Sequence, residues 1–155
     1  MTLTNEQLQL VGDSWKELKP VGMKEFGLLI YHGLFNDAPQ VRYLFQQLNV
    51  PQDGEITAED LRNNPKMIGL AMKTASSIAK FVENVEDDEE VEKMTTHLGK
   101  FHAEKNVKPE HFEHLAPILL KIIGNHLNLP ENSPTLQAWA QAYGILKDGI
   151  VSHYP

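Results

Sequence analysis

Apolar residues recur every three or four positions along almost the whole chain. The spacing is clearest near the two ends, at Leu8, Val11, Trp15 and Leu18 and again at Leu136, Trp139, Tyr143, Leu146 and Ile150. Such spacing places apolar side chains on one face of an α-helix. We find no strand pattern, internal repeat or low-complexity segment. The pattern therefore predicts an all-α protein of seven or so helices.

Capping residues and prolines mark where these helices begin. Thr4 and Gln7 form a capping box, and the pairs Asn64–Pro65 and Ser133–Pro134 each read as an N-cap followed by a first helical residue. We expect further helices from Pro20 to about Asn36, over about 37–45 and from Lys108, and one helical turn over 57–60. An acidic run, 86–90, separates the helix that carries Met67 and Val85 from the helix that carries Val91 and His102. Phe101, His102 and, further on, His126 are expected to face inward.

Composition narrows the class of protein. The chain has 155 residues, which suits one domain over 1–155, and its formal net charge of −7 argues against nucleic acid or an anionic membrane as a partner. It has no cysteine, so zinc–thiolate and iron–sulfur sites are excluded. No apolar run is long enough to span a bilayer, and the polar start lacks the features of a signal peptide. We therefore expect a cytoplasmic protein.

Two motifs suggest metals, and both have simpler interpretations. Residues 49–60 resemble an EF-hand loop, but Pro51 has no side-chain oxygen at the third position, and Asp60 is shorter than the glutamate that is usual at the twelfth. A polar loop followed by a helix cap is therefore favoured. His111 and His114 could share a metal at i, i+3 spacing, but no third ligand accompanies them. Phosphate-loop, G-x-S-x-G and H-E-x-x-H motifs are absent.

His102 is the remaining candidate for chemistry. It follows Leu98 by four residues and Phe101 by one, on the inward face of its helix. By spacing alone, a core histidine bonded to a backbone carbonyl is the better interpretation. Periodicity cannot identify a cofactor.

Four landmarks in order make the chain resemble a globin over nearly its whole length. "LGKFHAEKNVKPEHF" (98–112) resembles the stretch around the haem-linked histidine, and "NDAPQVRYLFQQL" (36–48) resembles the corner where Pro39 precedes Phe45. "NNPKM" (63–67) resembles the start of the distal helix, and Trp15 matches a tryptophan of the first helix. The resemblance implies a globin fold of seven to eight helices enclosing one haem.

The resemblance also implies one haem b whose iron is bound by His102. The other residues expected against the haem are Phe45, Leu70, Lys73, Thr74, Ile78, Leu98, Phe101, Val107 and Phe112. A neutral imidazole is a good iron ligand when its other nitrogen donates to an acceptor. Lys73 is expected to meet a haem propionate, with an ordinary solvated lysine as the alternative.

The distal side departs from the commonest globin pattern. Counting six residues from Asn64 gives Leu70 at the distal position, and no histidine occurs between residues 33 and 96. A shift in register would bring Met67 or Ala71 nearer instead. Leucine cannot donate a hydrogen bond, so Tyr31 becomes the expected donor to a distal gas, with Thr74 as a second. The alternative for Tyr31 is a core aromatic residue.

Reversible binding of dioxygen, for storage, transport or facilitated diffusion at a five-coordinate iron, is therefore the first functional hypothesis. The partners expected are dioxygen and other diatomic gases, and homo-oligomerisation is left open. The protein is not expected to be primarily an enzyme. The alternatives are a haem redox enzyme, such as a nitric oxide dioxygenase or peroxidase, a gas sensor, or a haem-free helical or calcium-binding module.

Overall fold

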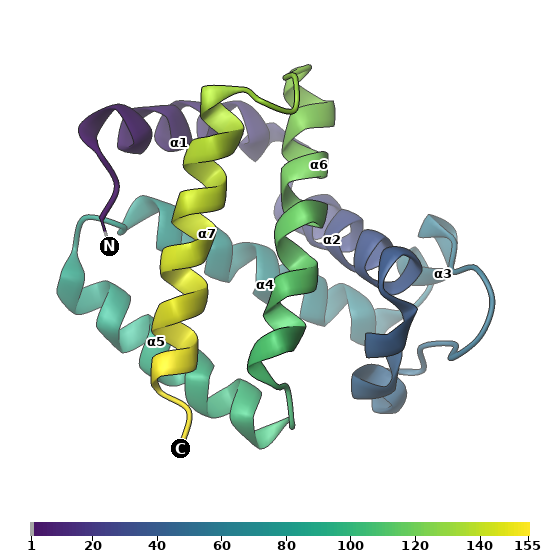
Figure 1. Cartoon of the computed structure of the whole chain (residues 1–155). Helices are drawn as coiled ribbons and strands as arrows, with labels where there is room; N and C mark the ends of the chain where they lie inside the picture. The colour runs from purple at the N-terminus through teal and green to yellow at the C-terminus, as the bar shows by residue number, and fades with distance from the viewer. Residues whose placement is uncertain (1) are drawn as a thin grey trace.

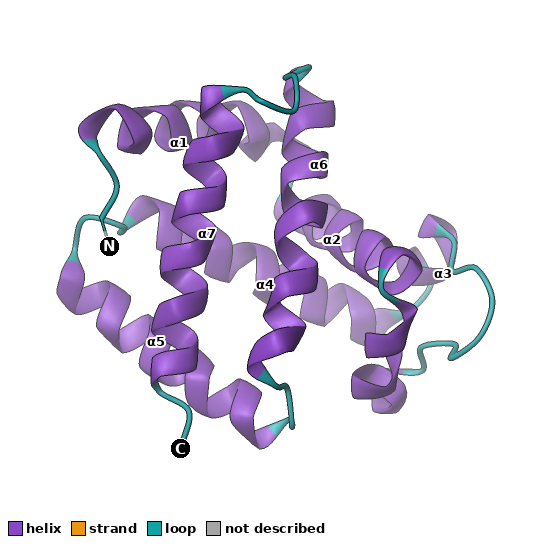
Figure 2. Cartoon of the chain, viewed as in Figure 1, coloured by secondary structure: helices purple, strands orange, loops and turns teal. Residues whose placement is uncertain are grey.

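The structure is a computed structural model that describes residues 2–155, and all regular structure in this range is helical (Figure 2). The α-helices are α1 (Asn5–Leu18), α2 (Met23–Asp37), α3 (Ala58–Arg62), α4 (Pro65–Glu83), α5 (Asp88–Glu104), α6 (Leu115–Leu127) and α7 (Pro134–Ser152). Three 3-10 helices join them, η1 (Lys19–Val21), η2 (Pro39–Leu48) and η3 (Pro109–His114). The all-α prediction is confirmed.

The predicted caps account for where most helices begin. Thr4 and Gln7 form the capping box of α1, and Asn64 and Ser133 accept backbone N–H groups at the starts of α4 and α7. A side-chain acceptor at this position satisfies a backbone donor that lacks a partner inside the helix. Asp87 caps α5 in the same way, so the acidic run contributes to the first turn of that helix.

The larger core cluster gathers buried side chains from α1, α2, α4, α5, α6 and α7. Trp15 and Trp139 are each 2% exposed, and the Trp15 ring packs edge-on against Phe26 at 5.6 Å between centroids. The indole N–H of Trp139 donates to Ser14 Oγ at 2.7 Å, which satisfies a buried donor. In Figure 1, α6 and α7 run side by side in front and α4 passes behind them.

Helices α2 and α4 meet at a second contact, which positions the two residues predicted as distal donors. Gly27 of α2 approaches the α4 backbone so closely that a Cβ there would lie 2.1 Å from the carbonyl oxygen of Ala71. Only a residue without a side chain permits this approach. Tyr31 lies one turn after Gly27 and Thr74 one turn after Ala71, so the same approach brings Tyr31 and Thr74 together.

Several details differ from the sequence predictions. Phe101 is 41% exposed and His126 is exposed, so the prediction that both face inward is wrong; Ile123 is buried on α6, whereas His126 is not. α4 ends at Glu83, so Val85 lies in the loop after it. The helix expected from Lys108 is divided into η3 and α6. No helix among residues 2–155 is both long and apolar enough to cross a membrane.

Candidate functional site

His102 lies in the last turn of α5, half-buried, with one ring nitrogen engaged. Its Nδ1 lies 2.7 Å from the carbonyl oxygen of Leu98, one turn earlier in the same helix. An N–H at Nδ1 donates to this carbonyl and leaves Nε2 with a free lone pair. Burial lowers the pKa of His102, while the bond to Leu98 acts in the opposite direction. The ring is therefore favoured in its neutral form, the form that binds metals.

Two phenylalanine rings stand edge-on to the imidazole. The Phe112 centroid lies 5.1 Å from the His102 centroid at an interplanar angle of 70°, and the Phe101 centroid lies 5.4 Å away at 89°. Phe112 is buried and Phe101 is exposed. Leu98 and Val107 are half-buried in the same core cluster as Phe112. Four of the residues predicted near the proximal side thus do surround His102 or pack in that region.

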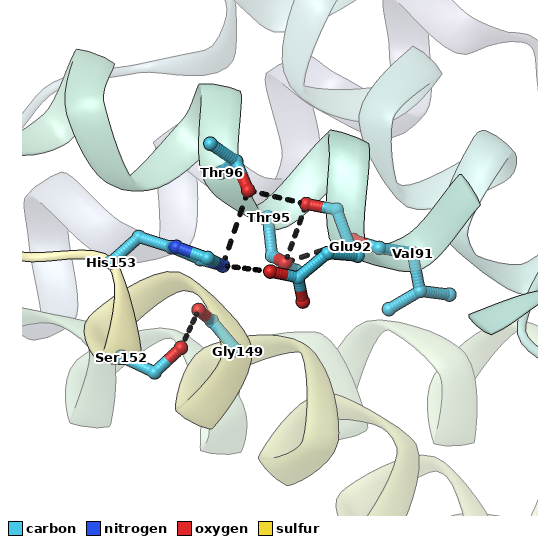
Figure 3. Close-up of polar contacts among 7 residues, drawn as sticks. All are labelled: Val91, Glu92, Thr95, Thr96, Gly149, Ser152 and His153. Atoms are coloured by element: carbon cyan, nitrogen blue, oxygen red, sulfur yellow. Dashed lines mark hydrogen bonds and ion pairs between the residues drawn. The ribbon is translucent and has the colours of Figure 1, made fainter. Parts of the chain in front are cut away.

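The C-terminal segment, residues 153–155, holds α5 in place through side-chain contacts of His153 and Tyr154. The sequence patterns did not indicate this role. Figure 3 shows His153 reaching Glu92 and Thr96 of α5; its Nε2 lies 3.2 Å from Thr96 Oγ1 and 3.2 Å from Glu92 Oε1. The Tyr154 hydroxyl donates to the carbonyl of Val107, 2.5 Å away, just after α5. These contacts lie on either side of His102 along the chain and restrict movement of its helix.

Tyr31 and Thr74, the two residues predicted on the distal side, form a polar pair. Tyr31 Oη lies 2.6 Å from Thr74 Oγ1, and Tyr31 is 8% exposed. Burial raises the pKa of Tyr31 to about 12, although the bond to Thr74 acts in the other direction. The phenol therefore stays protonated at neutral pH and keeps a proton to donate. Both residues predicted as donors are brought together.

Apolar side chains surround this pair. The Phe45 and Phe35 rings lie 5.7 Å and 5.8 Å from the Tyr31 ring, and Leu70 packs half-buried against the same cluster. Of the alternative distal residues, Met67 lies in this cluster and Ala71 faces Gly27 of α2. An apolar surround keeps water from competing for the two hydroxyls.

Two further predicted contact residues, both on α4, lie outside this cluster. Ile78 is buried, but it belongs to the larger core cluster. Lys73 is exposed on α4. The contact of either residue with a cofactor stays a prediction.

The two weaker metal motifs have structural explanations. His111 Nδ1 accepts the backbone N–H of Lys108 at 2.9 Å, and its Nε2 lies 3.3 Å from the Tyr43 hydroxyl, so both ring nitrogens have neighbours other than His114. Thr57 caps α3 together with Asp60, which confirms the loop-and-cap interpretation of residues 49–60. Within residues 2–155 no group of three or more His, Cys, Asp or Glu side chains is arranged to hold a metal ion.

Comparison with known proteins gives one family. The family model described as Globin matches residues 28–150. An extracellular monomeric globin of Tubifex tubifex is 25% identical over 126 residues, covering 81% of this chain and 81% of that protein. A protein named anaerobic nitrite reductase HBII from Casuarina glauca is 32% identical over 155 residues, covering 95% of this chain and 89% of that protein.

The fold agrees with this assignment. The crystal structure of ferric myoglobin from Aplysia limacina superposes with a TM-score of 0.79 and covers 98% of this chain and 99% of that one, at 19% sequence identity. The arrangement of the helices thus has its counterpart in one known architecture. The chain belongs to the globin family.

Proposed function

We propose that this globin holds one haem b through its iron on His102 and binds dioxygen reversibly. Globins bind haem with iron, and the family model covers the residues on both sides of the site. Haem, when bound, supplies an iron that takes up diatomic gases. The remaining question is which side chains of this protein favour dioxygen.

The single observation that carries the proposal is the state of the His102 ring. Nδ1 is held by the Leu98 carbonyl at 2.7 Å, and no hydrogen bond within residues 2–155 engages Nε2. A neutral imidazole oriented by a backbone carbonyl is the usual axial ligand arrangement for haem iron. The edge-on rings of Phe101 and Phe112 restrict rotation of the imidazole. The donor set therefore fits the cofactor.

The distal residues fit a polar diatomic ligand in an apolar space. Leu70 has no hydrogen-bonding atom, so the hydroxyls of Tyr31 and Thr74 are the predicted donors. A donor beside a gas that carries partial negative charge slows its escape. The phenol remains neutral because burial holds its pKa at about 12, and the aromatic residues Phe35 and Phe45 exclude water from it.

The experiment is a spectroscopic cycle on purified protein. The reduced protein is recorded under nitrogen, then under air, then under nitrogen again, and finally under carbon monoxide. The proposal expects a Soret band that shifts in air and returns under nitrogen, with no bis-histidine spectrum in either oxidation state. Immediate oxidation to the ferric form in air would contradict reversible binding, and a colourless protein that gains no band with haemin would contradict the haem itself.

A haem redox enzyme is the second candidate, because one relative at 32% identity is named an anaerobic nitrite reductase. Peroxidase chemistry has less support here. Leu70 offers no acid–base group, and a phenol with a pKa of about 12 is a poor proton acceptor at neutral pH. Turnover of nitrite, or of nitric oxide with dioxygen, in the presence of a reductase would favour the enzymatic role if it exceeded that of an ordinary oxygen-binding globin.

Several expectations from the sequence stay predictions. They are a single globin domain over the whole chain, a role in storage or transport rather than sensing, and a cytoplasmic location. The Tubifex relative is named as extracellular. Sedimentation of the loaded protein would test the oligomeric state.

A further inference from the structure

Arg42 is a buried cation without a carboxylate partner. It lies on η2 and is 3% exposed, although arginine is rarely buried unless it is paired. None of the ion pairs found within 4.0 Å among residues 2–155 includes it. Its charge is instead met by backbone dipoles. Nε donates to the carbonyl of Phe35 at 2.9 Å, and Nη1 lies 3.4 Å from the carbonyl of Pro51.

These two contacts engage only some of the N–H donors of the guanidinium. The Phe35 carbonyl belongs to the last turn of α2, where carbonyls lack partners inside the helix, so Arg42 acts as a cap for that helix. A guanidinium has five N–H donors in one plane. Nη2 has no hydrogen-bond partner within residues 2–155. It is not fully buried either, because Trp15 Nε1 is the one side-chain nitrogen or oxygen in that range that is both fully buried and without a partner.

Arg42 borders a surface cavity of about 600 Å³. Its lining residues come from the end of α2, from η2 and from the loop that leads to α3. The amide groups on its wall are largely engaged. Asn36 Nδ2 donates to two carbonyls, and Gln52 Nε2 donates to the carbonyls of Arg42 and Val50. His32 also lines the cavity, but of the lining residues Arg42 alone carries a permanent positive charge.

The surrounding charges restrict what can bind. Asp53 and Glu55 also line the cavity and are exposed, and the α2 C-terminus adds partial negative charge. Such a field disfavours a multiply charged anion. A planar oxyanion with one negative charge matches the guanidinium fork without strong repulsion. We propose that this cavity binds a small singly charged oxyanion of the carboxylate class, with Arg42 as the residue that recognises it.

The site is connected to the distal cluster through Phe35. Arg42 holds the Phe35 carbonyl, and the Phe35 ring lies 5.1 Å from Phe45 and 5.8 Å from Tyr31. An anion that draws the guanidinium toward the cavity weakens its hold on the end of α2. Anion binding is therefore expected to change the rate at which the distal side releases a gas. This consequence rests on the proposed function, whereas anion binding itself does not.

The test follows the Arg42 side-chain N–H signals of the full-length ¹⁵N-labelled protein by NMR during a titration with sodium formate at constant ionic strength. A saturable shift is expected with formate, a weaker response with phosphate, and none with chloride. Asp53→Asn combined with Glu55→Gln should tighten formate binding about threefold or more, because two exposed like charges are removed. Both positions are exposed, so this variant is expected to fold normally.

Arg42→Lys provides the complementary test, because lysine keeps the charge but not the fork. Formate binding should fall at least tenfold in this variant if it folds. A non-saturating shift, an equal response to chloride, or an unchanged affinity in the Asp53→Asn/Glu55→Gln variant would each overturn the proposal. The last criterion holds even if the Arg42 variant fails to fold.

Discussion

The hydroxyl of Tyr31 lies 2.6 Å from the hydroxyl of Thr74, beside an apolar cluster and one turn after the close approach of Gly27 to Ala71. A phenol is a stronger acid than an aliphatic alcohol, so Tyr31 is the better donor of the two. In the absence of a gas, its proton is therefore directed to Thr74. A distal ligand has to compete with Thr74 for that proton.

This competition predicts opposite effects for two substitutions. Tyr31→Phe removes the donor and should speed dioxygen dissociation about tenfold, the equivalent of one hydrogen bond. Thr74→Val removes the competing acceptor at similar volume and should slow dissociation. Stopped-flow displacement of dioxygen by carbon monoxide measures both rates. If Thr74→Val also releases dioxygen faster, Thr74 helps to hold the gas and the proposed competition is wrong.

Tyr31 should also make the folded protein sensitive to alkali. Its pKa is raised from 10.0 to about 12 in the folded state, so above pH 10 the unfolded chain loses a proton that the folded protein keeps. Stability contributed by the neutral phenol is complete below pH 10 and decreases as pH rises to 12. The loss is about 3 kcal/mol over this window, at about 1.4 kcal/mol for each pKa unit.

Urea unfolding at a series of pH values measures this loss. Tyr31→Phe should flatten the decrease between pH 10 and 12, although it should not remove it. Burial also raises the pKa of Tyr143, so that phenol contributes to the same loss. An identical pH dependence for the wild type and Tyr31→Phe would show that Tyr31 is not buried as described.

The approach of α2 to α4 gives a prediction about packing. Gly27→Ala would place a Cβ 2.1 Å from the Ala71 carbonyl oxygen, so the helices must separate. We expect a loss of about 2 kcal/mol or more in unfolding free energy and faster dioxygen dissociation, because Tyr31 moves with α2. Gly69→Ala on α4 is the matched control, since a Cβ there meets nothing within 4 Å. The control should be neutral or stabilising, by up to about 1 kcal/mol.

The C-terminal segment should affect the His102 side specifically. Tyr154→Phe removes the hydrogen bond to Val107 and should cost about 1 kcal/mol in stability. It should also speed transfer of haem to an apomyoglobin acceptor. Tyr43→Phe is the control, because Tyr43 is exposed and, among residues 2–155, its hydroxyl has a hydrogen-bond partner only in the side chain of His111. Equal rates of haem loss in the two variants would show that the C-terminal segment does not help to hold His102 against the haem.

The sequence patterns predicted several helices well because their starts carry a capping residue. Thr4, Asn64 and Ser133 cap the helices where expected, and the apolar spacing of α7 matches its buried face. The prediction that Phe101 faces inward was wrong because this residue lies at the border of an apolar face near the end of α5, where spacing does not decide between solvent and core. The same prediction for His126 was wrong for the same reason, because His126 lies near the end of α6.

The parts of the site that escaped prediction depend on contacts between distant segments. Nothing in the order of residues near His153 indicates Glu92 or Thr96 as its neighbours, because the chain must first fold α7 back on α5. Arg42 likewise looks like an ordinary surface arginine until the end of α2 and the loop at Pro51 close around it. Tyr31 and Thr74 could be predicted because the globin resemblance relates their two helices.

Replacement of His102 by glycine tests the central claim most directly, with His97→Gly as the matched control. His97 lies exposed on the same helix, so both variants carry the same helical cost of glycine. We predict that His97→Gly keeps the haem spectrum of the wild type, whereas His102→Gly loses its iron–imidazole spectrum and regains it when free imidazole is added. Unaltered haem uptake and spectrum in His102→Gly would contradict the assignment of His102 as the iron ligand.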